Sequence, residues 1–399
     1  MSLLDMLSRE ESWEKYYRYK TGLAVPKDFV KELRAFIDSH GYLKVCDGIE
    51  CGERFALPKK AIISKQGSAK KRVVYSYPYA ENMVLKLLTH LILRKYDGIY
   101  SDNLYSFRPG RSAKDAIRRI TLRPLKDRMY FYKVDVKNYF NSIPVDRLIP
   151  MIEDTLKDDT ELFDLLRRLL EEKYVLDEEE PVIEEKGIMA GTPIASFYAD
   201  LYLKELDRYF ADEGAVYARY SDDIIVFAQT EEKRDEYAGY IRRFLGDMGL
   251  DVNPDKEFCG NASEGFSFLG FEIKGSIIDI APASVVKMKQ KMRRKMRALD
   301  RWRKRGGFNR ERAAAAFIRI FNSKLLENAG DNDLTWSYWF FSVINTEKSL
   351  HMIDLYAQQC IRYLLAGTHS KARYNVRYSR LKELGYKSLV HAYYDFRIE

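Results

Sequence analysis

The sequence predicts an α+β fold, in which strands and helices follow one another along a globular chain. Segments rich in aromatic and β-branched residues, at 129–135, 216–228 and 266–273, are typical of strands. Segments 80–96 and 231–248 have the pattern of helices. From Ala283 onward the pattern is helical. Together these observations favour a sheet backed by helices, followed by a helical C-terminal part.

Composition limits the class of protein. The chain has 399 residues, of which 46% are hydrophobic, enough for two or three subdomains around a sizeable core. Lys and Arg number 67 against 59 acids, and a net charge of +8 is compatible with an anionic partner. Four cysteines are too few for a disulfide framework, and no apolar run is long enough to cross a membrane. We therefore expect a cytoplasmic protein that does not contact a membrane.

In the first third of the chain, the sequence pattern predicts charged helices followed by a basic hairpin. One helix ends at Gly22, and another lies between Pro26 and Gly41. A basic strand and loop fill residues 61–78, and a helix covers residues 80–96. A loop then leads into a further helix.

The middle of the chain contains the predicted strands. A strand lies within residues 129–144, and an acidic helical stretch and turn fill residues 145–186. One long helix is expected up to Phe210. In residues 285–307 an apolar stripe recurs every three or four positions, while Lys and Arg cover the other faces. The stripe consists of Met288, Met292, Met296, Leu299 and Trp302.

Two adjacent acids, Asp222 and Asp223, lie between apolar segments in "VYARYSDDIIVFAQT". A solvated hairpin turn would explain them, because Ser-Asp-Asp is good turn chemistry. A divalent cation such as Mg²⁺ would also explain them, because it offsets their repulsion. Asp135 ends another predicted strand, so three carboxylates would meet if the strands are neighbours. Such a set suits two-metal phosphoryl transfer, although 59 acids could also supply three unrelated surface positions.

Several further segments occur in a characteristic order. They are "VDVKNYFNSI", "GTPIASFYADLYLKELD", "RYSDDIIVF", "GLDVNPDK" and "FLGFEI". In order and spacing they are similar to the palm motifs of reverse transcriptases. From about Lys65 to Ile273 the chain resembles a bacterial reverse transcriptase of the group II intron-like lineage, most like the stand-alone, abortive-infection type associated with defence. The resemblance implies a right-hand polymerase with an antiparallel palm sheet, fingers, and a helical thumb and C-terminal extension.

The resemblance also implies a division of the chain. Residues 1–56 would form an N-terminal helical extension and residues 57–130 the fingers. Residues 131–280 would form the palm, with finger elements at 145–186. Residues 281–330 would form a basic helical thumb, and residues 331–399 a helical C-terminal extension.

By motif position, Asp135 and Asp222 would bind two Mg²⁺ ions, for which Mn²⁺ could substitute. Asp223 would be a supporting carboxylate, and Val136 would lend its backbone carbonyl. Lys256 matches a lysine that protonates the leaving pyrophosphate, and its alternative is an ordinary loop lysine. All three acids and Lys256 count as catalytic in this interpretation.

The resemblance assigns dNTP-binding residues as well. Lys65, Lys71 and Arg72 would hold the triphosphate, although a solvated basic hairpin is the plainer alternative. Phe140 would be the steric gate against ribonucleotides; alternatively it is a core aromatic, since residues 139 and 140 alternate across a strand. Gly191 begins a tight turn near the nucleotide. The chain departs from the family with Ala190 in place of a glutamine, which bears on nucleotide selection.

Template and primer contacts are implied at three places. Arg108, Arg111 and Pro193 match template-binding motifs. Phe268, Leu269 and Gly270 resemble the primer grip. Cations of the basic helix, represented by Lys291, Arg294 and Arg301, would follow the duplex backbone, with a solvated face as the alternative.

We expect an RNA-directed DNA polymerase that copies a dedicated non-coding RNA in antiphage defence, from a DNA or RNA primer and dNTPs. Other interpretations stay open: a group II intron maturase-like RNA-binding protein, a retron or diversity-generating enzyme, an untemplated DNA polymerase, or a non-catalytic binding protein. Twenty-nine tyrosines leave protein priming open, and a homo-oligomer is compatible with the sequence.

Overall fold

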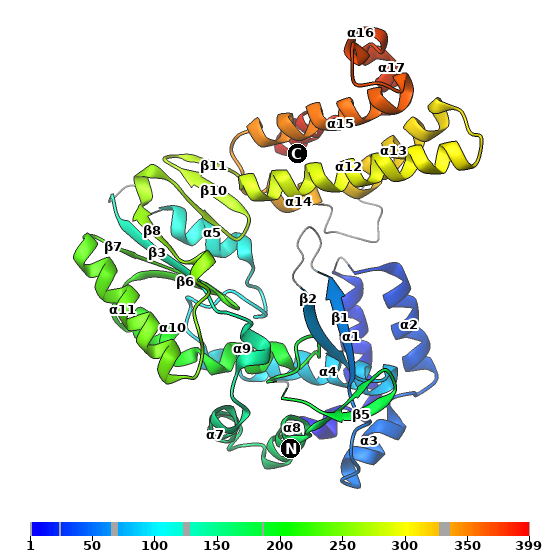
Figure 1. Ribbon diagram of the computed structural model, residues 1–399. Helices are drawn as coiled ribbons and strands as arrows, with labels where there is room; N and C mark the ends of the chain where they lie inside the picture. Colours follow the sequence, from blue (N-terminus) through cyan, green and yellow to red (C-terminus); the bar gives the residue numbers. More distant parts are fainter. Residues whose placement is uncertain are drawn as a thin grey trace. The chain divides into compact units, whose positions relative to one another are not determined.

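The computed structural model describes residues 2–23, 25–64, 71–122, 128–185, 187–326 and 336–398. The chain divides into two compact units, described separately below (Figure 1). The first holds Met1–Gly22 and Asp28–Glu264, and the second holds Leu23–Lys27 and Gly265–Glu399. Residues 265–280, which we expected to be part of the palm, thus belong to the unit that contains the C-terminal helices.

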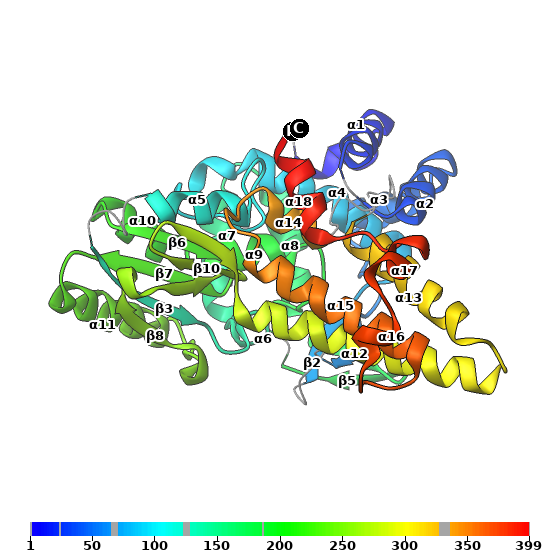
Figure 2. The ribbon, with the colours of Figure 1, turned by 90° about the horizontal axis from the view of Figure 1, so that it is seen from above.

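Helices form the N-terminal part of the first unit. A short 3₁₀ turn, η1 (Leu4–Met6), precedes α1 (Glu10–Thr21), α2 (Lys27–Asp38) and α3 (Leu43–Glu50), and α1 and α3 both contact α4 (Tyr79–Lys95) (Figure 1, Figure 2). The indole of Trp13 is fully buried and donates to the carbonyl of Leu7 at 2.7 Å. Gly22 caps α1, as predicted. These helices are therefore anchored by aromatic packing as well as by their helical pattern.

The predicted basic hairpin belongs to a four-stranded sheet of order β2-β1-β4-β5. Strands β1 (Lys59–Ser64) and β2 (Lys71–Ser76) are antiparallel, and β1 pairs in parallel with β4 (Tyr174–Asp177). β5 (Glu180–Ile183) completes it. The prediction for residues 145–186 was therefore incomplete: α7 (Val145–Thr155) and α8 (Thr160–Glu171) are helical, but two strands follow them.

The central sheet has the order β6-β7-β3-β8 and is antiparallel throughout (Figure 2). Its strands are β3 (Tyr130–Asp135), β6 (Val216–Tyr220), β7 (Asp223–Ala228) and β8 (Phe258–Asn261). Helix α11 (Glu231–Asp247) packs on β3 and β7, while α5 (Ala113–Leu122) packs on β6. The remaining short elements are η2 (Asp97–Ile99), α6 (Tyr139–Ser142), η3 (Pro254–Lys256) and η4 (Ala262–Glu264). The predicted α+β fold with an antiparallel sheet is confirmed.

The long helix expected up to Phe210 is broken. α9 (Ala195–Tyr202) and α10 (Lys204–Asp212) are separated at Leu203, where φ is −108° and ψ is 17°. The side chain of Arg219 donates to the carbonyl of Asp200 at 3.0 Å. In a continuous helix that carbonyl would bind the amide four residues later. The break therefore coincides with a buried side chain that takes over one helical carbonyl.

A buried ion pair joins α10 to β6. Arg219 and Asp207 are both fully buried, and two guanidinium nitrogens of Arg219 donate to the two carboxylate oxygens of Asp207, at 2.8 and 2.6 Å. The hydroxyl of Tyr217 donates to the same carboxylate at 2.9 Å. Burial raises the pKa of nearby Asp200 to about 8, although Arg219 acts against the rise. One cation thus stands among two acids, of which Asp207 is the direct partner.

The second unit joins a three-stranded sheet to helices. The sheet has the order β11-β10-β9, with β9 (Phe266–Phe268), β10 (Phe271–Lys274) and β11 (Ile277–Ile280). Helices α12 (Pro282–Arg305), α13 (Arg310–Leu325) and α15 (Lys348–Ala366) pack on one another. The others are α14 (Trp336–Phe341), α16 (Ala372–Asn375), α17 (Tyr378–Glu383) and α18 (Leu389–Ile398).

The apolar stripe of α12 is confirmed with one exception. Met288, Met292, Met296 and Leu299 are buried, whereas Trp302 is 39% exposed. Its ring lies against Phe308 instead, at 4.5 Å between centroids. Among the described residues, no helix combines the length and the apolar character needed to cross a membrane.

Replacing Asp207 by alanine is expected to lower the free energy of unfolding by about 3–5 kcal/mol, because the buried guanidinium of Arg219 then lacks its carboxylate. Urea unfolding followed by circular dichroism measures the change. Glu205→Ala is the matched control, since it removes an exposed acid from the same helix, and should change the value by less than about 0.5 kcal/mol. Similar losses in both variants would contradict the role of the buried pair.

Candidate active site

The two adjacent acids lie at a tight hairpin. Tyr220 of β6 pairs with Asp223 of β7, so Ser221 and Asp222 are the two residues of the turn. Ser221 has a φ of 58°, in the left-handed region that a two-residue hairpin loop requires. The hairpin turn, one of the two explanations that the sequence left open, is therefore present, and a cation at the two acids stays a prediction.

The third acid is brought to the turn by strand register. Strands β3 and β7 are neighbours, and Asp135 stands opposite Asp223. The amide of Val136 donates to the carbonyl of Asp222 at 3.1 Å. Asp135 is only 4% exposed. The condition set by the sequence, that the strands be neighbours, is thus met, and three carboxylates share one end of the sheet.

The electrostatics of the three acids suit a cation. Burial raises the pKa of Asp222 to about 6, and the charges of Asp135 and Asp223 add to the rise. The ammonium of Lys256 lies 2.5 Å from one carboxylate oxygen of Asp135, and the amide nitrogen of Asn253 lies 3.5 Å from the other. No three His, Cys, Asp or Glu side chains in the described part of the chain form a ready-made metal cluster. Carboxylates that repel one another are nevertheless the hard oxygen donors that fit Mg²⁺.

Buried polar side chains form hydrogen bonds with the backbone of the turn. The hydroxyl of Ser106 accepts the amide of Ser221 at 2.9 Å and donates to Asp200 at 2.7 Å. Arg219 donates to the carbonyl of Ser221 at 3.3 Å. Both backbone groups of the strained turn residue therefore have buried partners. Sequence reasoning missed Ser106, Asp200 and Arg219, although an Arg three residues before the acid pair was a visible signal.

The aromatic pair after Asp135 is not part of a strand. Asn138 has a φ of 52° and begins the short helix α6, so the expected alternation across a strand was wrong. Tyr139 is buried and donates its hydroxyl to the carbonyl of Ala199 at 2.6 Å. Phe140 is half-buried, and its ring meets the ring of Phe107 edge-on, at 6.4 Å between centroids. Phe107, which the sequence analysis did not single out, is 40% exposed.

Gly191 is required by the neighbouring strand. Its φ is 106°, and an added Cβ would lie 2.9 Å from the carbonyl oxygen of Tyr75 in β2. The amide of Tyr75 donates to the carbonyl of Ala190 at 2.8 Å. Pro193, two residues later, is half-buried. The turn before α9 is thereby attached to the basic hairpin.

The predicted cations differ in their surroundings. Lys71 and Arg72 are exposed on β2, while Lys65 lies outside the described residues. Arg108 is buried, and its guanidinium donates to Asp97 at 2.8 and 3.0 Å and to the carbonyl of Ser101 at 2.6 Å. Arg111 pairs with Asp102. Template binding by Arg108 would therefore compete with an internal ion pair.

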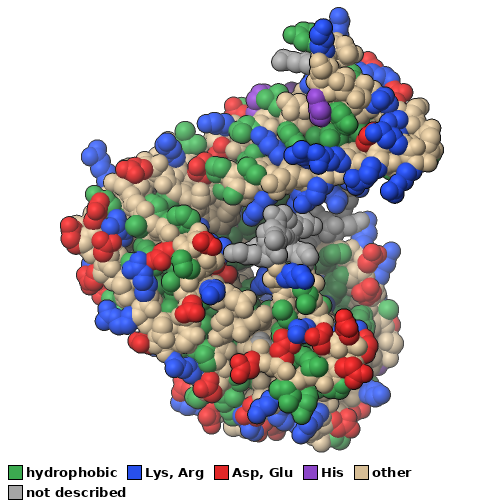
Figure 3. All heavy atoms as spheres, viewed as in Figure 1, with side chains coloured by type: hydrophobic (Ala, Val, Ile, Leu, Met, Phe, Trp, Pro, Cys, Tyr) green, Lys and Arg blue, Asp and Glu red, His purple; other side chains and the backbone are tan. Residues whose placement is uncertain are grey.

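The second unit carries the remaining predicted residues. Phe268 is buried, and Leu269 and Gly270 have φ values of 49° and 87° in the turn between β9 and β10. The basic face of α12 is exposed, and Lys and Arg gather over this helix (Figure 3). The residues predicted to act there, all exposed, are Lys291, Arg294 and Arg301.

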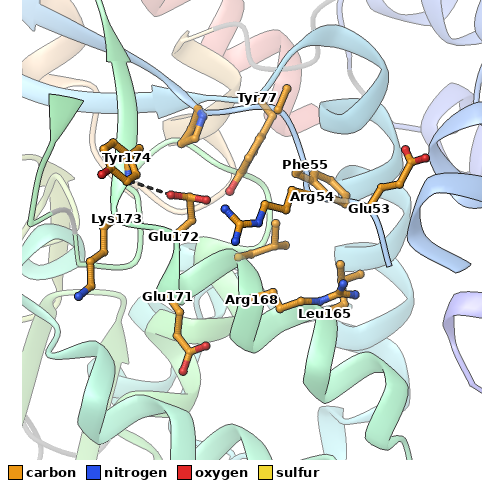
Figure 4. A pocket seen from close by; sticks show the side chains of 13 residues that line it. Glu53, Arg54, Phe55, Tyr77, Leu165, Arg168, Glu171, Glu172, Lys173 and Tyr174 are labelled. Atoms are coloured by element: carbon orange, nitrogen blue, oxygen red, sulfur yellow. Dashed lines mark hydrogen bonds between the residues drawn. The ribbon is translucent and has the colours of Figure 1, made fainter. Parts of the chain in front are cut away.

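A cavity of about 340 Å³ in the first unit holds none of the predicted site residues (Figure 4). Phe55, Tyr77 and Leu165 contribute apolar surface, and acids and bases alternate around them. The backbone amide of Tyr174 donates to Glu172 at 2.9 Å. Because the cavity is lined by both acids and bases, its charges favour neither a cation nor an anion as ligand.

Comparisons with known proteins place parts of the chain beside intron-encoded proteins. The putative COX1/OXI3 intron 2 protein of Saccharomyces cerevisiae is 22% identical over 265 residues, 52% of this chain and 31% of that protein. The group II intron-encoded protein LtrA of Lactococcus lactis subsp. cremoris is 24% identical over 167 residues, 42% of this chain and 27% of that protein. The chain thus spans less than a third of these curated relatives.

Among solved structures, apo telomerase from Candida tropicalis is similar with a TM-score of 0.46 and 14% identity, covering 83% of this chain and 69% of that one. Residues 58–273 match the family described as reverse transcriptase (RNA-dependent DNA polymerase). That match covers more than half of the sequence and includes all three carboxylates. The chain therefore belongs to the reverse transcriptase family.

Proposed function

We propose that the protein is an RNA-directed DNA polymerase that extends a primer with dNTPs. The observation that carries the proposal is the register of β3 and β7, which sets Asp135 opposite Asp223 beside the turn that holds Asp222. This end of the sheet lies within the residues that match the reverse transcriptase family.

The three carboxylates are proposed to bind two Mg²⁺ ions, for which Mn²⁺ could substitute. Asp135 and Asp222 would be the principal ligands, Asp223 a supporting one, and Val136 would offer its carbonyl. When bound, the ions supply activation of the primer hydroxyl and stabilisation of the leaving oxygen. The side-chain nitrogen of Lys256 lies 2.5 Å from a carboxylate oxygen of Asp135, and we propose that Lys256 protonates the leaving pyrophosphate.

The fingers are proposed to bind the incoming nucleotide. Lys71 and Arg72 are exposed cations on β2, and the same strand binds the turn at Gly191. Phe140, beside Phe107, would exclude the ribose 2′-hydroxyl. Lys65 is assigned to the triphosphate by motif alone. Binding of the triphosphate and selection of the sugar would thus come from neighbouring segments of the first unit.

Template and primer contacts are proposed for both units. In the first, Arg111 and Pro193 would approach the template. In the second, the turn at Leu269 and Gly270 would support the primer, and the exposed cations of α12 would follow the duplex backbone.

The dedicated non-coding RNA and the defence role are finer proposals. They are supported by the resemblance of the palm motifs to stand-alone bacterial reverse transcriptases. A maturase-like RNA-binding protein and an untemplated polymerase are the alternatives, and the extension assay described next distinguishes them.

Asp222→Asn and Asp135→Asn are each expected to lower RNA-templated primer extension by at least about 10³-fold, because the amide carries no charge to bind the cation. Labelled dNTPs, Mg²⁺ and sequencing of the product measure this. Asp251→Asn, which neutralises an exposed acid near β3, should retain activity. Product that copies one RNA would support the proposal, homopolymer would indicate untemplated synthesis, and bound RNA without product would favour the RNA-binding alternative.

Metal binding can be measured without catalysis. Without divalent cations, Asp222→Asn should be more stable than the wild type, since one repelling charge is removed. Adding Mg²⁺ should raise the wild-type Tm by about 2–4 °C and that of the variant by less. Equal shifts in both proteins would argue against a cation at these carboxylates.

Phe140→Val is expected to reduce discrimination against ribonucleotides by about tenfold or more, because a smaller side chain leaves room for the 2′-hydroxyl. The ratio of kcat/KM for a dNTP to that for the matching rNTP measures the effect. An unchanged ratio in a variant with normal dNTP use would assign sugar selection to another residue.

A further inference from the structure

A second group of like charges lies where helix α1 meets helix α4, in the N-terminal part of the first unit. Lys20 is near the end of α1, and Lys86 and Arg94 lie about two helical turns apart on α4. None of the three forms a salt bridge with a described carboxylate, and Glu32 acts on Lys86 only at longer range. These three cations are called the α1–α4 cluster below.

Aromatic rings separate the cations of the cluster. The ammonium of Lys20 lies 5.2 Å from the ring centroid of Tyr16 and 5.5 Å from that of Tyr19. The guanidinium of Arg94 lies 4.5 Å from the same Tyr19 ring, and the ammonium of Lys86 lies 4.8 Å from Phe29. The rings fix the directions of the cations without neutralising them.

His90 adds a neutral donor to the cluster. Burial lowers its pKa to about 3, and the charges of Arg94 and Lys20 contribute to the decrease. A guanidinium nitrogen of Arg94 lies 2.9 Å from Nδ1, which must accept because Arg only donates. The ring proton is therefore on Nε2, where it can be donated to a ligand.

Burial of Lys20 and Lys86, and mutual repulsion of the three cations, make the α1–α4 cluster unfavourable for the stability of the fold when no anion is bound. Burial lowers the pKa of Lys20, and the charges of Lys86 and Arg94 lower it further. Cations held together without an anion repel one another, as the carboxylates do without a metal ion. A phosphate would offset this repulsion and accept hydrogen bonds from all three.

We propose that the α1–α4 cluster, with the rings of Tyr19 and His90, binds backbone phosphates of a single-stranded RNA segment at a site built from other elements than the carboxylate site. Tyr19 is 38% exposed, so a base can stack on it while the cations hold the neighbouring phosphates. The choice of RNA over another phosphate-bearing ligand rests on the proposed function; the anion site itself rests on the geometry.

The test compares two variants of equal charge. Lys20→Gln with Lys86→Gln removes two cations of the cluster, and Lys15→Gln with Lys31→Gln removes two exposed lysines from α1 and α2. Affinity for a labelled 20-nucleotide oligo(U) is measured by fluorescence anisotropy at several salt concentrations, in EDTA and without dNTPs. The cluster variant should bind about tenfold more weakly than the control. Its plot of log affinity against log salt should be shallower by about 1.4.

Three results would be decisive. Equal affinity and slope in the two variants would overturn the site. If the cluster variant is no longer stabilised against heat by inorganic phosphate or dATP, but binds the oligonucleotide as tightly as the control variant does, the site binds a phosphate ligand other than RNA. Protection of Lys20 and Lys86, but not Lys15, from acetic anhydride by the oligonucleotide would support the proposal directly.

Two further measurements distinguish loss of the RNA site from misfolding of the variant and from absence of polymerase activity. The cluster variant should melt no lower than the control without RNA, since it relieves repulsion. The comparison is repeated in the Asp222→Asn background, where binding is read without chemistry. A protein without primer extension that still shows the predicted difference would contradict the polymerase and leave the RNA site standing.

Discussion

The buried pairing of Arg219 with Asp207 is the interaction on which the first unit depends. The guanidinium of Arg219, in strand β6, binds Asp207 in helix α10. It also donates hydrogen bonds to the carbonyl of Asp200, at the break before α10, and to the carbonyl of Ser221. Such a pair is expensive to desolvate, and its benefit is definition of geometry more than stability. Here that geometry belongs to the turn that carries Asp222, so the position of this acid depends on a buried cation three residues earlier in the chain.

At two places in the described part of the first unit, like charges lie close together, and we propose a ligand of opposite charge for each. The three carboxylates share a sheet end and the cations of the α1–α4 cluster share a helix contact. At both places burial shifts the pKa of a group toward its neutral form, for Asp222 upward and for Lys20 downward. A fold keeps such an arrangement when a ligand of opposite charge is bound during function, because the repulsion is then offset. The same reasoning therefore underlies both proposals, the metal site at the carboxylates and the RNA site at the cations.

The sequence predicted the parts of the site whose signals are local. Aromatic and β-branched residues indicated the strands around Asp135 and Asp223, and Ser-Asp-Asp indicated the turn, so that the acids were expected to meet if the strands are neighbours. It missed what depends on distant partners. Arg219 has the appearance of a surface residue until Asp207 is seen beside it, and Trp302 fits the apolar stripe by spacing but is partly exposed and lies against Phe308. Strands β4 and β5 lay hidden in an acidic segment because their pairing with β1 is a tertiary effect.

The two-residue turn has a consequence for how this protein can diverge. Side chains alternate across a strand, so a one-residue slip between β3 and β7 would send Asp135 to the opposite face from Asp223. With only Ser221 and Asp222 in the connection, no slack exists to absorb an inserted or deleted residue between β6 and β7. An inserted or deleted residue in this hairpin would therefore change the register that places the acids together, whereas a change of length in a loop away from the hairpin would leave that register intact.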